Sequence, residues 1–431
     1  MTILESLMKC VKCGLLVGIV SGLYWGAPAA AGAADEPSAL AALAAEAVIA
    51  SPSLEALAAR ERALRERAAA AGAWPDPVLG VEYSNAPLSS FAIADHPMSG
   101  VQLKVQQTLK TPGWSAQARQ VGALSADAAA LERDEAALSL SAAVRASWWS
   151  LTGSRLLEAT TREHVAYVDE LLAAALYRYE VGAAGQSVVL RLELLRARLA
   201  DDLVEYQRSE VELEAALAGA LARPPGARFE TPAAVTPAPP PTERDWAALA
   251  ADSRPVFAVK AARIAAAEAG AELARLDARI DPAIWAGYRV RTVETETDPG
   301  VDLVSVGVGV PIPLGSGRRA RSEQAARLET AAAERAGLAA AEDAVAAEMA
   351  AVLARWTRAH QKADTYRETL IPAARAARDA TLSDYTVGEA GFAALLEAEV
   401  VLLDLERTWI AAAVETHLQQ ARATALVGVT P

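Results

Sequence analysis

Tyr-Glu-Val-Gly-Ala-Ala-Gly, residues 179–185, and Tyr-Thr-Val-Gly-Glu-Ala-Gly, residues 385–391, are two versions of one motif. They lie 206 residues apart, and at this offset eight of the 21 residues from Tyr179 to Leu199 are identical. Each motif interrupts a long helical pattern rich in alanine and leucine with paired glycines, which suits a tight turn between two helices. The sequence therefore predicts a duplicated unit, and each copy contains a hairpin of two helices.

Both turns place the same residue types at the same spacing. A glycine that is expected to adopt positive φ follows a Tyr-x-Val run, and a second glycine comes three residues later. The eight positions are Tyr179, Val181, Gly182, Gly185, Tyr385, Val387, Gly388 and Gly391. An ordinary helix C-cap would need the first glycine of each turn but not the repeated Tyr-x-Val before it. The pattern alone leaves open whether these turns are caps or contact points for a partner.

The composition favours long helices over several globular domains. Aromatic residues make up 5% of the 431 residues, alanine is very abundant, and Gly and Pro gather at a few points. Small side chains of high helix propensity allow long helices to pack closely. The formal net charge of −13 disfavours nucleic acid as a partner.

Residues 1–33 have the features of a secretory signal peptide. Two lysines precede an apolar run, and an Ala-x-Ala pattern at residues 31–33 follows it. The run is too short to span a bilayer, and no later stretch reaches roughly 18 uncharged apolar residues, so no transmembrane helix is expected. Both cysteines, Cys10 and Cys13, would be removed with this segment. The sequence thus predicts export, without disulfides or Cys-ligated metals.

The first repeat, residues 34–222, begins with a helical pattern and then changes to strands. Trp-Pro-Asp-Pro at 74–77 ends the helix, because two prolines in four residues cannot both lie inside it. Apolar and polar residues then alternate over about 77–85 and 100–109, which is the period of strands with one apolar face. A helix without proline follows from Trp114 to the first turn and would be roughly 100 Å long.

The proline-rich segment 223–242 is the predicted linker between the two copies. The second repeat, residues 243–431, has the same plan as the first. We expect a helix over 243–279, strands over about 283–293 and 302–312, and further helices up to the end of the repeat. Each copy therefore contributes two strands and a helical hairpin.

One face of the four predicted strands is apolar and the other is polar. Lys104, Arg289 and Arg291 lie on the polar face, and a one-residue slip in register would move such cations to the apolar side. A hairpin that caps a soluble coiled coil would leave the apolar rows exposed, whereas the strands of an outer-membrane barrel turn these rows to lipid. Four strands are too few to close a barrel, but three chains would supply twelve.

In these features the sequence resembles the TolC-like outer-membrane efflux family over nearly all of residues 34–431. The marks are the tandem halves, two strands per half after a proline stop, and the Tyr-x-Val-Gly turns with an amphipathic run after each. The resemblance implies a mainly α-helical chain with a small transmembrane β part. Long helical hairpins would form a trimeric periplasmic α-barrel, and four strands per chain would contribute to a 12-stranded barrel in the outer membrane of a Gram-negative bacterium.

The implied function is that of the outer-membrane channel of a tripartite efflux system. Such a channel passively conducts a substrate that an inner-membrane RND-type pump and a periplasmic membrane-fusion adaptor deliver. The turns at 111–114 and 314–319 are most similar to those of the heavy-metal (CzcC/CusC-type) subgroup, which makes heavy-metal cations a candidate cargo. The alternatives are the outer-membrane duct of a type I protein secretion system and a periplasmic coiled-coil adaptor or scaffold that is not a channel.

No enzyme, cofactor or metal site is expected. The sequence contains no Gly-x-Ser-x-Gly, phosphate-binding loop or metalloenzyme motif. Its four histidines are scattered, and no His, Cys or Met cluster has the spacing of metal ligands.

The resemblance assigns the turn residues above to adaptor docking, and it also points to a gate. After the glycine of its second turn the family carries an Arg at two residues and acidic residues at six and nine; this chain has Ala390, Ala394 and Glu397. Arg191 occupies the position equivalent to Glu397 in the first repeat. We hypothesise that these two opposite charges constrict the periplasmic entrance of the trimer, although two solvated surface charges would explain them equally well.

The cations on the polar face of the strands are the candidate lining of the barrel lumen. Lys104, Arg289 and Arg291 would face water there and would tune the ion preference of the channel. A polar residue that only meets solvent would occupy the same positions, so the pattern alone does not separate the two explanations.

Overall fold

The computed structural model describes residues 36–85, 97–183, 185–241, 246–291, 300–312 and 315–428. The predicted signal peptide, residues 1–33, lies outside this part of the chain, and so do the last two residues of the strand expected over 283–293.

The first repeat has the predicted order of elements. They are α1 (Ser38–Ala50), α2 (Pro52–Ala71), β1 (Val78–Ser84), β2 (Gly100–Thr108), α3 (Trp114–Glu180) and α4 (Gln186–Ala220). The break between α1 and α2 has a local cause: the Ser51 side chain accepts a hydrogen bond from Leu54 N at 3.4 Å, and Pro52 occupies the first turn of α2. Both features are typical of a helix start.

The second repeat follows the same plan. Its elements are α5 (Trp246–Ser253), α6 (Pro255–Asp277), β3 (Ala283–Arg291), β4 (Leu303–Gly309), α7 (Ser316–Thr365), η1 (Tyr366–Leu370), α8 (Ile371–Val387) and α9 (Phe392–Val427). The mainly helical fold with a small strand part is confirmed, with strands at the predicted places.

Proline accounts for two details of the second repeat that differ from the expected plan. The helix expected over 243–279 divides at Arg254, because Pro255 starts a new helix there, as Pro52 does in the first repeat. The long helix before the second turn contains a π-helical segment, η1, just ahead of Pro372. Proline lacks an N–H and clashes with the carbonyl of the preceding turn, and a wider π turn is one way to accommodate such a residue.

All four strands join one antiparallel sheet in the order β1-β2-β3-β4. The central pair joins the two repeats, with Leu103 opposite Tyr288 and Lys104 opposite Gly287. The predicted apolar residues therefore form continuous rows, such as Val81, Leu103, Tyr288 and Val304. The alternation in the sequence therefore predicted correctly which residues of each strand lie on the apolar face.

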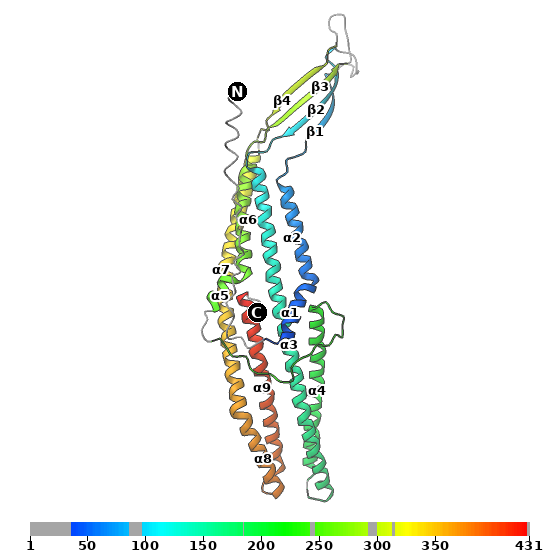
Figure 1. Cartoon of the computed structure of the whole chain (residues 1–431), viewed down its shortest axis with the longest axis vertical. Helices are drawn as coiled ribbons and strands as arrows, with labels where there is room; N and C mark the ends of the chain where they lie inside the picture. The colour runs from blue at the N-terminus through cyan, green and yellow to red at the C-terminus, as the bar shows by residue number, and fades with distance from the viewer. Residues whose placement is uncertain are drawn as a thin grey trace, which may run out of the picture. The chain divides into compact units, whose positions relative to one another are not determined.

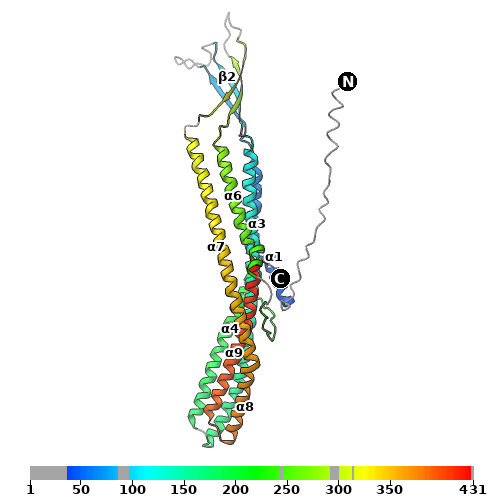
Figure 2. The same cartoon turned by 90° about the vertical axis from the view of Figure 1, so that its left-hand side faces the viewer.

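The sheet lies at one end of the long helices, and the α3–α4 and α8–α9 turns lie at the other (Figures 1 and 2). The helix α3 spans 67 residues and packs against α2 and α4 of its own repeat and α6 and α9 of the second. Small residues allow the closest approaches: a Cβ added to Gly122 of α3 would lie 2.6 Å from Ala68 of α2. The length of α3 sets the separation of the sheet from the turns.

Among the described helices, no single one is both long and apolar enough to cross a membrane; the pair of α1 and α2, bent by 45°, meets that test on length and composition alone.

Candidate functional site

The sheet exposes its aliphatic side chains. Val304, Val306 and Val81 are 74%, 78% and 69% exposed, although valine is a residue that water-soluble sheets bury. On the opposite face of β4, Leu303, Ser305 and Gly307 are less exposed than the valines between them. This arrangement is the reverse of a soluble sheet, and it suits strands whose outer face meets lipid.

The polar face of the sheet carries the predicted lumen residues. Lys104 Nζ lies 4.8 Å from the centre of the Trp285 ring, and Arg289 Nη2 donates a hydrogen bond to Gln102 Oε1 at 2.8 Å. Arg291 Nε donates to the carbonyl of Pro97 at 2.8 Å. The three cations therefore lie on one face of the sheet, as expected.

One aspartate fixes the base of the sheet to the long helices. Asp281, just before β3, accepts hydrogen bonds from Lys110 Nζ at 2.8 Å and from the Thr111 backbone N–H at 3.1 Å. Close by, Trp114 Nε1 at the start of α3 donates to Asp277 Oδ1 at 2.7 Å. These contacts join the strand–helix junction of the first repeat to that of the second.

Both hairpin turns end their first helix in the same way. Gly182 has φ +74° and Gly388 has φ +83°, as predicted. Ala183 N donates to Arg178 O at 2.7 Å, and Glu389 N donates to Asp384 O at 2.9 Å. This six-residue closure beside a left-handed glycine is a Schellman motif. A Cβ on either glycine would meet nothing within 4 Å, so the backbone conformation, rather than crowding, favours glycine.

The second glycine of each turn has another role. Gly185 and Gly391 have extended backbones, with φ −80° and −78°, and precede α4 and α9 as N-cap residues. Of the two glycines in each turn, only the first has a positive φ.

The side chains of the two turns are not equivalent. Val181 and Val387 are 59% and 72% exposed, and Tyr179 is also exposed. Tyr385 is half-buried instead, because its ring packs against Phe392 at 5.8 Å and under the Arg178 guanidinium at 4.9 Å. Tyr385 thus joins the two hairpins, while the valines and Tyr179 are available to a partner.

The candidate gate residues lie on the surface of their helices. Arg191 on α4 and Glu397 on α9 are both exposed. Within the described part of the chain, neither side chain forms an ion pair. Their placement is compatible with contacts to other copies, and it leaves the gate as a hypothesis.

A buried ionic cluster between the two repeats was not predicted. His164 on α3 contacts Glu399 and Glu406 on α9, with Nδ1–Oε1 at 2.5 Å and Nε2–Oε2 at 2.8 Å. Burial alone would lower the pKa of His164, but the two carboxylates outweigh burial and raise it to about 9. The histidine is therefore a buried cation between two carboxylates.

The neighbours of this cluster add further charge. Arg375 Nη2 on α8 donates to Glu406 Oε1 at 2.6 Å, and Arg378 Nη1 lies 3.8 Å from Glu399 Oε2. Glu163, Tyr167 and Leu402 also line the cavity of about 190 Å³ at this cluster. His164 and Glu399 are 235 residues apart, so no local pattern in the sequence could have paired them.

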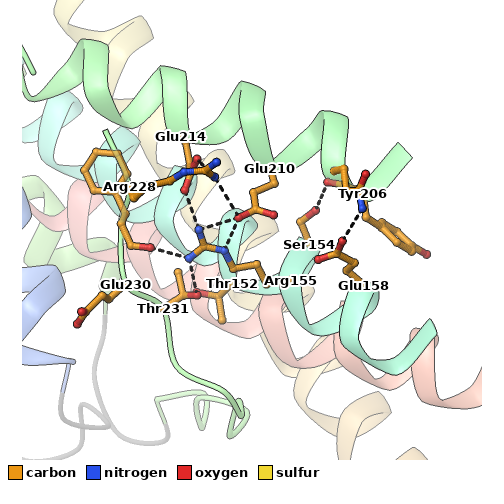
Figure 3. Close-up of polar contacts among 12 residues, drawn as sticks. Thr152, Ser154, Arg155, Glu158, Tyr206, Glu210, Glu214, Arg228, Glu230 and Thr231 are labelled. Atoms are coloured by element: carbon orange, nitrogen blue, oxygen red, sulfur yellow. Dashed lines mark hydrogen bonds and ion pairs between the residues drawn. The ribbon is translucent and has the colours of Figure 1, made fainter. Parts of the chain in front are cut away.

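The proline-rich segment is bound to the helices, and we call residues 223–241 the strap. Figure 3 shows Arg155 of α3 with the polar groups around it. Arg155 Nη1 donates to the Phe229 carbonyl at 2.6 Å and to Thr231 Oγ1 at 3.0 Å, and its Nη2 donates to Glu214 of α4 at 2.7 Å. The guanidinium therefore joins the strap to both helices of the first hairpin.

The strap continues onto the second repeat. Thr236 O lies 2.8 Å from His417 Nε2 of α9. The Ala238 backbone N–H donates to Thr416 Oγ1 at 2.8 Å, and its carbonyl accepts from Trp356 Nε1 of α7 at 2.9 Å. The predicted linker thus holds the two repeats together through defined hydrogen bonds.

The sheet exposes its aliphatic face, and we call it inside-out for that reason. An inside-out sheet at one end of long duplicated helices is the arrangement expected of an outer-membrane channel subunit. Residues 246–429 match the sequence model of the family described as "Outer membrane efflux protein". The second repeat therefore carries the sequence features of this family. Proteins of this family are outer-membrane channels and not enzymes.

Solved structures share the fold over nearly the whole chain. The outer-membrane channel OprN aligns with a TM-score of 0.76 and 18% identity, covering 91% of this chain and 90% of OprN. VceC from Vibrio cholerae has a TM-score of 0.75 and 18% identity, with 90% and 96% covered. CusC has a TM-score of 0.75 and 12% identity, with 91% and 92% covered. No curated protein matches the sequence.

Among the described residues, no group of three or more His, Cys, Asp or Glu side chains is arranged to hold a metal ion.

Proposed function

We propose that three copies of this chain form the outer-membrane duct of a tripartite efflux system, which passively conducts solute supplied by an inner-membrane pump through a periplasmic adaptor. The four-stranded sheet of each copy contributes to one twelve-stranded barrel, and the helical hairpins form a tube below it. Closure of the barrel removes the open strand edges, which cannot persist in lipid.

The inside-out sheet is the observation that carries this proposal. Its aliphatic rows are continuous across β1, β2, β3 and β4, and their valines are among the most exposed apolar residues of the described chain. A water-soluble adaptor or scaffold would have to cover so large an apolar surface. Lipid on the outside and water on the inside account for both faces at once.

The hairpin turns are the proposed docking points for the adaptor. Val181, Val387 and Tyr179 are exposed and lie where α3 and α8 end. The turns that follow these helices lie at the opposite end of the helices from the sheet (Figure 1), where a periplasmic partner would meet the tube. Exposed apolar side chains beside a hydrogen-bonded turn suit a compact hydrophobic contact. Val181→Glu combined with Val387→Glu should abolish efflux in cells that depend on this channel, while trimer formation and conductance in lipid bilayers stay as in the wild type.

Arg191 and Glu397 are the proposed gate. Charges of opposite sign that alternate around the entrance attract one another and favour a narrow state. Arg191→Ala and Glu397→Ala should each raise the open current of the reconstituted channel. If neither variant raises it, the two residues are ordinary surface charges.

Two measurements test the channel function itself. The protein should fractionate with the outer membrane, and its trimer should migrate differently on gels before and after boiling, as folded barrels do. The purified trimer should then conduct ions across a planar lipid bilayer. Recovery of all the protein from the soluble periplasm, or a folded trimer that inserts without conducting, would contradict the proposal.

A further inference from the structure

All four charged side chains of the strands lie on one face of the sheet. The aliphatic face carries none, and its rows consist mainly of Val, Leu, Ile and Tyr. On the polar face the charged residues are Glu82, Lys104, Arg289 and Arg291. Three cations and one anion leave that face with a net positive charge, in a chain whose formal net charge is −13.

Among the described residues, the positive charges of Lys104 and Arg289 are not cancelled by carboxylates. The partner of Lys104 is the Trp285 ring, and that of Arg289 is the neutral amide oxygen of Gln102. Within the described residues, neither Lys104 nor Arg289 forms an ion pair. A cation bound to a neutral partner keeps its field, whereas a cation in an ion pair largely loses it at a distance.

Two glycines leave room for the side chains that contact the cations to lie close against the sheet. A Cβ on Gly287 would lie 2.2 Å from Gln102 Nε2, and a Cβ on Gly307 would lie 2.5 Å from Trp285 Cζ2. Gln102 and Trp285 therefore lie flat over neighbouring strands, and each contacts one of the two cations. These two partners therefore hold both cations beside neighbouring strands of the sheet.

We propose that the polar face of the sheet is an anion-favouring section of the duct, set by Lys104 and Arg289, and that it favours cargo bearing carboxylate or phosphate groups. This inference rests on the proposed function, because it takes the polar face as the inner wall of the barrel. Three copies would then place rings of lysine and arginine around the pore, opposed by a ring of glutamate. Rings of basic side chains are a general means of favouring anions in a pore.

The test measures ion selectivity of the purified full-length trimer in planar bilayers under a KCl gradient. Lys104→Gln combined with Arg289→Gln should shift the reversal potential toward the potassium value and lower the chloride-to-potassium permeability ratio several-fold. Two matched variants bracket this result. Lys104→Arg with Arg289→Lys keeps both charges and should keep the wild-type potential, whereas Glu82→Gln should shift the potential toward the chloride value.

The outcomes separate this inference from the function on which it rests. A reversal potential that is unchanged in the double glutamine variant, or that moves toward the chloride value, overturns the anion-favouring wall while the channel stands. Folded trimers that carry no current in any variant contradict the channel function. Gel mobility before and after boiling identifies variants that fail to fold, and the charge-keeping pair then shows whether charge or packing is responsible.

Discussion

His164 on α3 and Glu399 on α9 are joined by a 2.5 Å contact between Nδ1 and Oε1, with both side chains at least nine-tenths buried. The contact crosses from the first repeat to the second, and Glu406 holds the other ring nitrogen at 2.8 Å. Helix α3 belongs to the first hairpin and α9 to the second. This cluster therefore fixes the packing of the two hairpins against one another.

Loss of the His164 cation should destabilise the protein. His164→Leu leaves Glu399 and Glu406 buried without their shared partner, and breaking a buried ion pair on one side costs about 3 kcal/mol. The midpoint of heat-induced loss of helical circular dichroism should therefore fall clearly. Glu170→Gln, an exposed change on the same helix, is the matched control and should leave the midpoint unchanged. Equal midpoints for His164→Leu and the wild type would contradict a stabilising role.

The stability of the cluster should depend on pH. The folded state raises the pKa of His164 from 6.5 to about 9, so its protonated ring stabilises the fold fully below about 6.5. This stabilisation decreases as pH rises and is lost as pH passes through about 9. Between pH 6 and pH 10 the wild-type melting temperature should fall more than that of His164→Leu. Parallel curves for the two proteins would exclude His164 as the source of the pH dependence.

The first glycine of each turn should be intolerant of a side chain. Gly182 and Gly388 have positive φ, so Gly182→Ala or Gly388→Ala should each cost about 1 kcal/mol. Gly219→Ala is the matched control: Gly219 lies in the last turn of α4, has no positive φ and has open space where a Cβ would be added. That change should be neutral or stabilising, because alanine has the higher helix propensity. Equal melting temperatures for the three variants would contradict this explanation, because an added Cβ meets nothing within 4 Å at any of the three positions and only φ distinguishes them.

The strap should depend on Arg155. Arg155→Ala removes two hydrogen bonds to the strap and should let it open locally. Trypsin would then cleave after Arg228, whose following residue Phe229 is buried in the intact strap. The wild type and Arg162→Gln, which changes an exposed arginine of the same helix, should resist the enzyme. Equal cleavage rates at this bond would show that Arg155 does not hold the strap.

Periodicity and turn chemistry were sufficient to predict most of the fold. The alternation around Lys104 and Arg289 predicted both faces of the sheet, because a side-chain period of two allows only one register with an apolar face. Gly182 and Gly388 were predicted to adopt the left-handed backbone conformation, because the helical pattern ends sharply at each of them. Both signals are local, and each needs only a few neighbouring residues.

The contacts between repeats could not be predicted in this way. His164 and Glu399 come together only because α3 and α9 pack side by side, and nothing in either segment encodes its distant partner. The difference between Tyr179 and Tyr385 has the same origin: the motifs are alike, but only Tyr385 lies under Arg178 of the other hairpin. The strap was predicted as a linker because prolines exclude helix, and composition does not tell a bound extended segment from a free one.

The most direct test of the account is whether β1 of one copy pairs with β4 of the next. These are the outer strands of the sheet, and residues 34–431 contain no cysteine. Val81→Cys combined in turn with Val304→Cys, Val306→Cys or Val308→Cys should yield disulfide-linked trimers in the outer membrane, most strongly for one partner, because register is fixed. Each single-cysteine variant should give no more than dimers. Only monomers from all three pairs, in protein that is folded and in the membrane, would contradict the twelve-stranded barrel.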